Sequence, residues 1–316
     1  IDLKCTRVRY ALPKIIMLSR RKPDVIFSAL GNLNLALSII RPLLAGGVRY
    51  VGRETSIVSN KLSNERHRRL RTWAYRHCYS RFDAVVCQSR YLLDDLAVNF
   101  SLDREKAVII YNPVDIERIN RLASEGIPDD PEPARPAPER AIRLVAAGRL
   151  TYAKGFDLLI ESLALCGDPR LKLTLLGDGG LRGQLENLAR EKGLAERVRF
   201  AGFRKNPYPF FARADAFVLS SRYEALPNVV LEALACGTPV IANPAAGGTR
   251  EILEAIPGCE LAESVSAPAL AAAIRRWLVR KPGRLSADAV SPYAVREIAG
   301  KYEELILRVA SFAVNS

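Results

Sequence analysis

The sequence has little histidine, no paired cysteines and no long apolar run, and each absence excludes a class of protein. Only two histidines occur in 316 residues, which nearly excludes a histidine-ligated metal site. The six cysteines form no C-x-x-C pair, so neither a zinc knuckle nor a disulfide framework is indicated, and a reducing cytoplasm is the expected compartment. No apolar run approaches the roughly 20 residues that span a bilayer, because the longest, 33–40, is interrupted by Asn34 and Ser38.

Positive charge is present but unevenly placed. Residues 1–124 contain 22 Lys and Arg against 11 Asp and Glu, whereas the remaining residues contain 25 against 23. The composition is otherwise that of a globular chain, with 49% hydrophobic residues. The first part of the chain is therefore expected to meet an anionic partner.

A proline-rich stretch divides the sequence. Residues 125–140 contain five prolines in sixteen positions, which suits a stiff surface linker because proline fixes φ and removes a backbone donor. On both sides of it, continuous apolar strands alternate with helical patterns, which is typical of parallel sheets covered on both faces. The sequence therefore predicts an α/β protein with two Rossmann-like, doubly wound domains at 1–124 and 141–290, followed by a helix in 291–316 that Ser291 and Pro292 open.

The expected elements follow this alternation. The strands are 24–28, 48–53, 83–89, 107–112, 142–148, 171–177, 197–202, 216–220, 239–243 and 258–262. The helices fall near 32–45, 61–80, 89–97, 154–166, 180–192, 206–213, 227–235, 247–254 and 266–279.

Two strand-to-helix loops of the second domain are candidate ligand sites, because open α/β sheets bind ligands at the carboxyl ends of their strands. Arg149 and Lys154 follow a buried strand and precede a helix. Two cations beside a helix start would suit a diphosphate, although they could equally be ordinary surface charges. The LGDGG turn at 176–180 either lets the backbone approach a ligand or is a plain tight turn.

A third loop carries two acids in the pattern E-x7-E. Glu224 lies in the loop, where its carboxylate can accept hydrogen bonds from sugar hydroxyls, and the N–H groups of Leu226, Asn228 and Val229 can face a phosphate. Glu232 lies in an otherwise apolar helix, where burial without a partner is costly, and a ribose diol would supply two donors. The alternative is an acid pair placed by the helix dipole.

Together these motifs resemble the retaining family 4 glycosyltransferases of the GT-B fold, in particular bacterial enzymes that build polysaccharide, lipopolysaccharide or undecaprenyl-linked glycans. The resemblance is carried by GRLxxxKGFD, LGDGG, VRFAGFRKNP, ADAFVLSSRYEALPNVVLEALACGTPVIA and GGTREIL, and upstream by KPDVIFS, RYVGRETS, RFDAVVCQS and VIIYNPVD. The family opens with a strand, a Gly-rich loop and a long helix, so the sequence is expected to lack that first segment and the first domain to be incomplete at its start.

The resemblance implies two domains facing across a cleft, with the last helix crossing back onto the first domain. It implies transfer of a hexose from a nucleotide sugar, with UDP likelier than GDP as the carrier, to a glycan or lipid-linked acceptor. Arg149, Lys154 and Glu224 would be catalytic. The residues that would bind the donor are Gly148, Gly177, Phe203, Arg204, Leu226, Asn228, Val229 and Glu232. No cofactor is expected, and the lack of a D-x-D motif agrees with a metal-independent enzyme.

Two departures from the family concern Ala225 and Glu54. Ala225 stands where the family often has the glycine of E-G-L-P, and Ala cannot take positive φ as easily as Gly. Glu54 lies where the family often has a histidine, and it could hydrogen-bond the acceptor or the donor sugar, or simply pack within its loop. Two other functions stay open, a non-catalytic nucleotide-sugar-binding or membrane scaffold and a sugar-nucleotide epimerase of the same fold.

The segment 61–81 accounts for much of the basic charge. It has seven Lys and Arg, one Glu and three interleaved aromatic residues, and on a helix Leu62, Leu70, Trp73 and Ala74 can face inward. Such a helix suits an anionic membrane surface, and we favour this over a merely solvated face and over nucleic acid. A lipid-linked acceptor would then place the protein in the cytoplasm, peripheral on the inner face of the plasma membrane.

Overall fold

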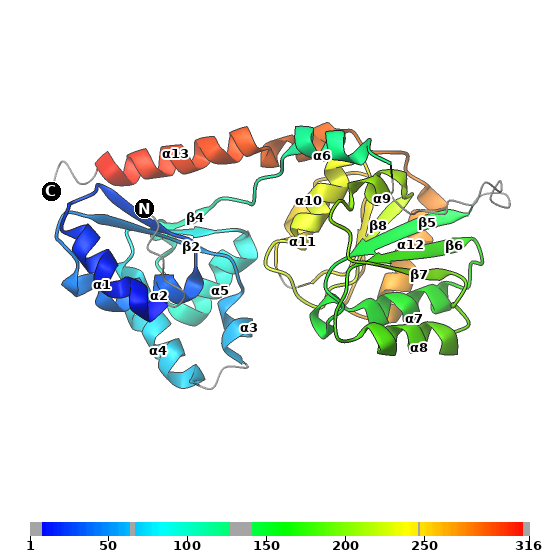
Figure 1. The fold of residues 1–316 in the computed structure, drawn as a ribbon, viewed down its shortest axis with the longest axis horizontal. Helices are drawn as coiled ribbons and strands as arrows, with labels where there is room; N and C mark the ends of the chain where they lie inside the picture. The colour runs from blue at the N-terminus through cyan, green and yellow to red at the C-terminus, as the bar shows by residue number, and fades with distance from the viewer. Residues whose placement is uncertain (1–7, 64–66, 127–140, 246, 312–316) are drawn as a thin grey trace. The chain divides into compact units, whose positions relative to one another are not determined.

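The computed structural model describes residues 8–63, 67–126, 141–245 and 247–311. The chain divides into two compact units (Figure 1). Unit 1 comprises residues 1–112 and 296–316, and unit 2 comprises residues 113–295. The division lies before the helix α6 (Ile116–Ala123). The sequence predicts it later, in the proline-rich segment 125–140. Residues 127–140 of that segment lie outside the described part of the chain.

Unit 1 is built on a parallel sheet in the order β1-β2-β3-β4. Its strands are β1 (Val25–Ser28), β2 (Arg49–Glu54), β3 (Ala84–Cys87) and β4 (Ala107–Ile109). Its helices are α1 (Val8–Ser19), α2 (Gly31–Ile40), α3 (Val58–Ser63), α4 (Arg68–Cys78), α5 (Arg90–Phe100) and α13 (Val295–Ser311), with the 3-10 turns η1 (Arg41–Leu43), η2 (Tyr79–Arg81) and η3 (Arg104–Lys106). The four strands coincide with the apolar runs from which they were predicted.

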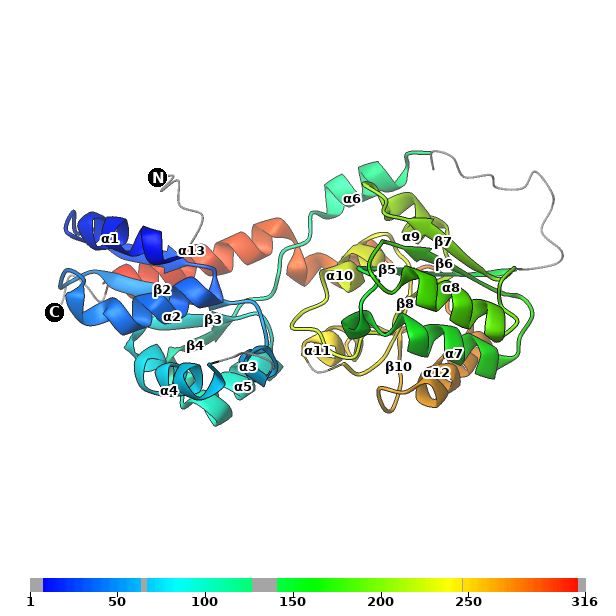
Figure 2. The same ribbon diagram turned by 60° about the horizontal axis from the view of Figure 1, so that its bottom comes forward.

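Helices cover both faces of this sheet because successive strand residues point to opposite sides. Tyr50 and Val85 pack with residues of α1 to α5 on one face. Val51 and Val86 pack on the other face with Leu305 and other residues of α13. Figure 2 shows α13 behind the sheet of unit 1, opposite α2. The last helix thus completes the core of the unit in which the chain starts.

The region 61–80 was predicted as one helix, but it forms the separate helices α3 and α4, and the packing of α4 also differs from the expectation. Leu62 and Ala74 are buried, whereas Leu70 and Trp73 are 66% and 54% exposed. The buried face of α4 is formed by Ala74, Tyr75 and Cys78 instead. No helix of the described chain has the length and apolar character that crossing a membrane requires.

The start of the last helix also differs. Ser291 and Pro292 lie in the 3-10 segment η5 (Ala287–Tyr293), and α13 begins only at Val295. A bridge between Val114 and Ala294 lies just before it.

Unit 2 contains a six-stranded parallel sheet in the order β10-β9-β8-β5-β6-β7. Its strands are β5 (Ile142–Ala147), β6 (Leu171–Leu176), β7 (Val198–Gly202), β8 (Ala216–Leu219), β9 (Val240–Ala242) and β10 (Glu260–Leu261). Its helices after α6 are α7 (Phe156–Cys166), α8 (Arg182–Glu191), α9 (Tyr208–Arg213), α10 (Asn228–Ala235), α11 (Thr249–Leu253) and α12 (Ala267–Arg280), with the 3-10 turn η4 (Tyr152–Lys154). The chain winds outward from β5 in one direction to β7 and in the other to β10. The prediction of a doubly wound α/β domain is confirmed, and the strand order reverses between β5 and β8.

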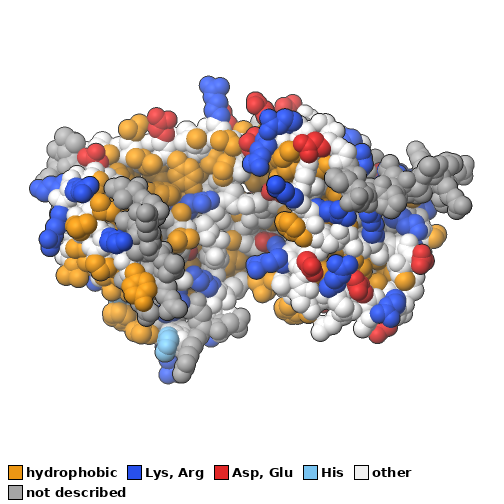
Figure 3. Space-filling view, viewed as in Figure 1, with side chains coloured by type: hydrophobic (Ala, Val, Ile, Leu, Met, Phe, Trp, Pro, Cys, Tyr) orange, Lys and Arg blue, Asp and Glu red, His pale blue; other side chains and the backbone are white. Residues whose placement is uncertain are grey.

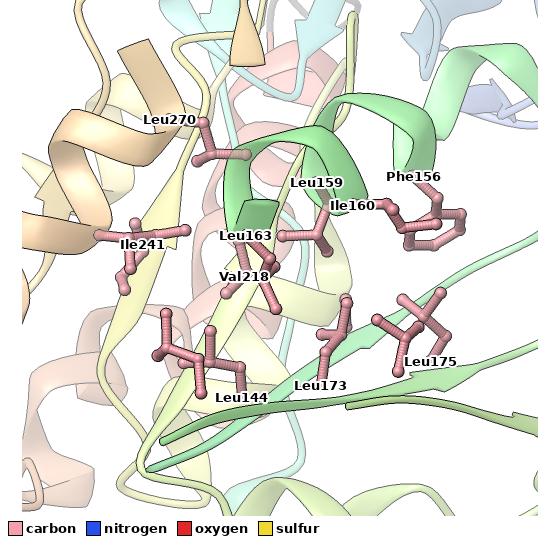
Figure 4. Packing of buried hydrophobic residues seen from close by; sticks show 14 of the residues in the cluster. Leu144, Phe156, Leu159, Ile160, Leu163, Leu173, Leu175, Val218, Ile241 and Leu270 are labelled. Atoms are coloured by element: carbon pink, nitrogen blue, oxygen red, sulfur yellow. The ribbon is translucent and has the colours of Figure 1, made fainter. Parts of the chain in front are cut away.

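The main core of unit 2 lies between the sheet and three helices (Figure 4). Leu144, Leu173 and Val218 point to the face that α7, α8 and α12 cover, where Leu163 of α7 is fully buried. Truncating such a leucine costs about 2–5 kcal/mol in a well-packed core. This rigid layer holds the carboxyl ends of the strands, and the loops that follow them, in fixed positions.

Candidate functional site

A cavity of about 610 Å³ lies in unit 2 where the loops after β5, β6, β7 and β8 converge. This is the point at which the strand order reverses, where open α/β sheets characteristically bind ligands. The residues of the second domain that the sequence marked as catalytic or donor-binding all line it. They are Gly148, Arg149, Lys154, Gly177, Phe203, Arg204, Glu224, Leu226, Asn228, Val229 and Glu232.

Lys154 and Glu224 meet in this cavity as an ion pair. Lys154 ends η4 in the loop after β5, and its Nζ lies 2.5 Å from Oε1 of Glu224 in the loop after β8. Ser221 donates a second hydrogen bond to the same oxygen at 2.7 Å. The two side chains are 26% and 14% exposed, so the pair is partly withdrawn from water. An anionic ligand that bound the Lys154 ammonium would therefore compete with the Glu224 carboxylate for it.

Arg149 supplies a second cation to the cavity. It is exposed, and within the described ranges no ion pair involves it. The helix α10, which begins at Asn228, lines the same cavity, and its start has no side-chain cap among the described residues. Two cations and a helix start lining one cavity make it suitable for a diphosphate.

Glycines let the loops of the site pack more closely than side chains would allow. Gly177 has φ +131°, and a Cβ there would lie 1.9 Å from the carbonyl oxygen of Gly148. Gly247 has φ +121°, and its Cβ would lie 1.6 Å from the carbonyl oxygen of Glu224. Ala225 is not among the described residues with positive φ, so alanine fits the E-A-L-P turn without strain. In the LGDGG turn, loop packing at the site requires glycine at Gly177, because a Cβ there would collide with the backbone of Gly148.

Glu232 forms a different kind of site. It lies on α10 partly buried, and burial raises the pKa of its carboxyl, with no hydrogen bond or cation from the described residues to offset the effect. The pKa of Tyr208 on the adjacent α9 is also raised, first by burial and then by the charge of Glu232. A pair of hydroxyl donors from a ligand would remove this cost.

The loop after β7 adds an aromatic and a cationic group to the cavity wall. Phe203 is 77% exposed although it is a large apolar side chain. The guanidinium of Arg204 lies 5.8 Å from the ring centroid of Phe210, and its Nε is buried without a hydrogen-bond partner in the part of the chain that the structure describes. An exposed ring beside a cation suits a planar, polar ligand group such as a nucleobase.

Several residues of the site were missed in the sequence. Asp178, Pro207 and Phe211 line the cavity, and only Asp178 had a local signal, as part of LGDGG. Arg222 and Asp157, which are 65 residues apart and do not line the cavity, form an ion pair between the loop after β8 and the first turn of α7. No local pattern indicates such a pair, because it exists only once the sheet has formed.

Glu54, the candidate acceptor residue, lies apart from this cavity, at the end of β2 in unit 1. It is 1% exposed, and its Oε1 accepts hydrogen bonds from Tyr79 and Asn34. Burial raises the pKa of its carboxyl, partly offset by these hydrogen bonds. A side chain so enclosed is not available to a sugar, and loop packing is the reading that the geometry supports.

Comparison with known proteins gives two family matches. The sequence model of "Glycosyl transferases group 1" matches residues 130–290, and that of "Glycosyltransferase Family 4" matches residues 3–118. The first match spans the strands, loops and helices that form the cavity.

Among similar proteins is the N-acetylgalactosamine-N,N'-diacetylbacillosaminyl-diphospho-undecaprenol 4-alpha-N-acetylgalactosaminyltransferase of Campylobacter jejuni. It is 34% identical over 177 residues, which are 55% of this chain and 45% of that protein. The lipopolysaccharide core biosynthesis glycosyltransferase LpsE of Rhizobium meliloti is 44% identical over 110 residues, or 35% of this chain and 32% of that protein. The chain thus spans less than half the length of these two relatives.

Among solved structures, Alr3699/HepE of Anabaena in complex with UDP is similar in fold. The two share a TM-score of 0.77 at 23% identity, over 94% of this chain and 82% of that one. At this identity the likeness establishes the fold alone, which is the GT-B fold of two α/β domains with parallel sheets.

Proposed function

The chain belongs to the glycosyl transferases group 1 family, and on that premise we propose that it transfers a hexose from a nucleotide sugar to a glycan or lipid-linked acceptor in bacterial surface polysaccharide synthesis. The observation that carries the proposal is the cavity of unit 2, in which two cations, a helix start and two acids converge. The relatives named above are glycosyltransferases, and one of the similar structures holds UDP.

The proposed donor pose follows from the chemistry of the cavity wall. Arg149 and Lys154 bind the diphosphate, and Glu224 accepts hydrogen bonds from hydroxyls of the sugar. Glu232 accepts from the ribose diol, and the ring of Phe203 packs on the base. Leu226, Asn228 and Val229 contribute backbone contacts to phosphate. Gly148 and Gly177 let the surrounding loops pack closely, because a Cβ at Gly148 would meet the Lys154 side chain and one at Gly177 would meet the carbonyl oxygen of Gly148.

We propose transfer with retention at the anomeric carbon. The bond from that carbon to the diphosphate oxygen breaks, the acceptor oxygen bonds to the same face, and the acceptor hydroxyl proton passes to the departing diphosphate. Negative charge develops on the leaving diphosphate, and Arg149 and Lys154 are placed to stabilise it as it forms. With these cations in place no divalent metal is required, so activity should survive an excess of EDTA. Loss of activity on chelation, restored by Mg²⁺ or Mn²⁺, would contradict this part of the proposal.

The acceptor is proposed to be a lipid-linked glycan presented at an anionic membrane surface. The C. jejuni relative is named for transfer to a diphospho-undecaprenol. On α4, the exposed Leu70 and Trp73 lie among the exposed Arg68, Arg69 and Arg76, a combination that suits an interfacial helix. On the face that Figure 3 shows, Lys and Arg side chains of unit 1 lie among exposed hydrophobic ones, with few Asp or Glu. No nucleic-acid partner is proposed.

Vesicle flotation tests this partner. The protein should float with vesicles rich in phosphatidylglycerol, and the double substitution Leu70→Ala/Trp73→Ala should weaken flotation. Val279→Ala, which removes an exposed apolar side chain of unit 2, is the matched control and should have no effect. Binding that is unchanged in about 1 M salt, or equal on neutral vesicles, would contradict the electrostatic account.

Calorimetric titration with UDP and GDP tests the donor site. One of the two should bind, and Lys154→Ala should weaken that binding by roughly 10- to 100-fold, as expected for loss of a charge-assisted contact. Lys192→Ala, which removes an exposed lysine at the end of α8, is the control for net charge. If both nucleotides bind, and the Lys154→Ala variant binds them as tightly as the wild type, the proposed donor site is refuted. Nucleotide-sugar binding without turnover on any lipid-linked acceptor would favour a scaffold, and interconversion of the sugar itself would favour an epimerase.

A further inference from the structure

Arg222, which does not line the cavity, joins the segment that carries Lys154 to the loop that carries Glu224. Its Nη1 donates to Oδ1 of Asp157 at 2.8 Å and its Nη2 to Oδ2 at 2.5 Å, which is a bidentate pair with the first turn of α7. Nη1 also donates to the carbonyl oxygen of Tyr152 at 2.8 Å, and the guanidinium lies 4.0 Å from the centroid of the Tyr152 ring. One side chain thus holds both ends of the segment that contains Lys154.

The backbone completes this connection. The Arg222 N–H donates to the carbonyl oxygen of Ala153 at 2.8 Å, and the Ser220 hydroxyl donates to that of Lys154 at 2.8 Å. Gly155 makes the approach possible, because with φ +61° its missing Cβ would lie 2.2 Å from the carbonyl oxygen of Ser220. The turn η4 and the loop after β8 are therefore one packed unit.

The Arg222–Asp157 pair is partly buried. The Arg222 side chain is 16% exposed and that of Asp157 is 38% exposed. Burial alone would raise the pKa of Asp157, but the hydrogen bonds and charge of Arg222 outweigh it and hold that pKa below its usual value. Bidentate pairs of this kind fix geometry as well as adding energy.

We propose that Arg222 is a positioning residue for the donor site, which holds the ammonium of Lys154 at the place where the diphosphate binds. This role rests on the proposed function. Arg222 itself does not line the cavity, so it acts through the turn Tyr152–Lys154. Lysine has a flexible four-carbon stem, and its contribution to binding depends on how firmly the backbone beneath it is held. Arg222 lies only two residues before Glu224, so its bonds to Asp157 and Tyr152 also set the distance between Lys154 and Glu224.

A double-mutant cycle with UDP as the probe tests this role. In the wild-type background, Lys154→Ala should weaken UDP binding by roughly 10- to 100-fold. In the Arg222→Ala background the same change should weaken it by less than about threefold, because the ammonium is no longer held in place. Arg222→Lys keeps the charge but cannot span both carboxylate oxygens and the carbonyl, so it should restore only part of the lost affinity. Tyr152→Ala, which removes the ring and keeps the carbonyl, offers a milder variant should Arg222→Ala fold poorly.

Arg276→Ala is the matched control for a merely structural loss. Arg276 binds the Glu260 carboxylate at 3.3 Å and the Leu261 carbonyl at 2.8 Å, away from the cavity, so its removal should lower thermal stability without changing the effect of Lys154→Ala. If Lys154→Ala weakens UDP binding equally with and without Arg222, the positioning role is overturned while the donor site stands. If Lys154→Ala has no effect in the wild type, the proposed donor site fails and the role of Arg222 fails with it.

Discussion

Replacing Glu224 by glutamine separates two functions of the Lys154–Glu224 ion pair. In the structure the ammonium and the carboxylate satisfy one another at 2.5 Å. A bare nucleoside diphosphate must draw the Lys154 ammonium away from Glu224, and it has no sugar hydroxyl to donate a hydrogen bond to the Glu224 carboxylate in its place. A nucleotide sugar can offer its hydroxyls to the carboxylate in exchange. The pair therefore penalises the bare nucleotide relative to the intact donor.

The size of the penalty follows from the burial of the pair. A charge-assisted hydrogen bond contributes about 1.5–3 kcal/mol, and the partial exposure of both side chains places this one toward the lower end. If the diphosphate forfeits about 1 kcal/mol of that interaction, then Glu224→Gln should tighten UDP binding roughly fivefold. The same change should weaken or leave unimproved the binding of a UDP-sugar, because an amide oxygen is a poorer acceptor than a carboxylate.

Titration calorimetry at constant ionic strength measures both affinities. Glu186→Gln is the control for the change in net charge, since Glu186 pairs with Arg182 at 2.9 Å on the exposed surface of α8. Weaker binding of bare UDP by Glu224→Gln would refute the competition argument. Glu224 would then act by holding Lys154 ready for the diphosphate.

Three further predictions concern stability and pH. Gly177→Ala should lower the free energy of unfolding by more than about 2 kcal/mol in urea titration, because of positive φ and the collision with Gly148, and a smaller loss would mean that the loop relaxes freely. Leu163→Ala should cost about 2–5 kcal/mol in the same assay without abolishing UDP binding, and an effect below 1 kcal/mol would contradict the packed core. Since burial raises the pKa of Glu232, the stability that its protonated form contributes is present at low pH and lost as the pH rises through the folded-state pKa. Glu232→Gln should therefore leave stability nearly unchanged at about pH 4 and raise it at about pH 7, and a loss of stability at neutral pH would refute this.

Much of the fold could be predicted from the sequence because buried parallel strands are recorded locally. Each β-branched run between turn residues became a strand, and β5 is typical, because its consecutive residues Leu144, Val145 and Ala146 are all buried. The helices α1 and α6 escaped prediction for local reasons. Pro13 lies inside α1, and α6 is only eight residues long beside the proline-rich segment.

The cavity residues could be predicted together because the carboxyl ends of parallel strands meet at one edge of the sheet. What could not be predicted depends on partners distant in the chain. The burial of Glu54 depends on Tyr79 and Asn34 from other elements, and the hold of Arg222 on Asp157 depends on the order of β5 and β8. The exposure of Trp73 likewise depends on which side of α4 the sheet occupies.

The helix α13 has a consequence for the order in which this protein can mature. It supplies Ile298, Leu305 and Val309 to a core whose other buried members, among them Val51 and Ile110, come from the first 112 residues. As the chain is synthesised, that face of the first sheet stays bare until the whole of unit 2 and then α13 have emerged. Unit 2, by contrast, is one uninterrupted stretch of chain, 113–295, and can finish folding on its own schedule. The cavity of unit 2 should therefore form before unit 1 is closed, and the nucleotide that we propose to bind there would stabilise unit 2 at that stage.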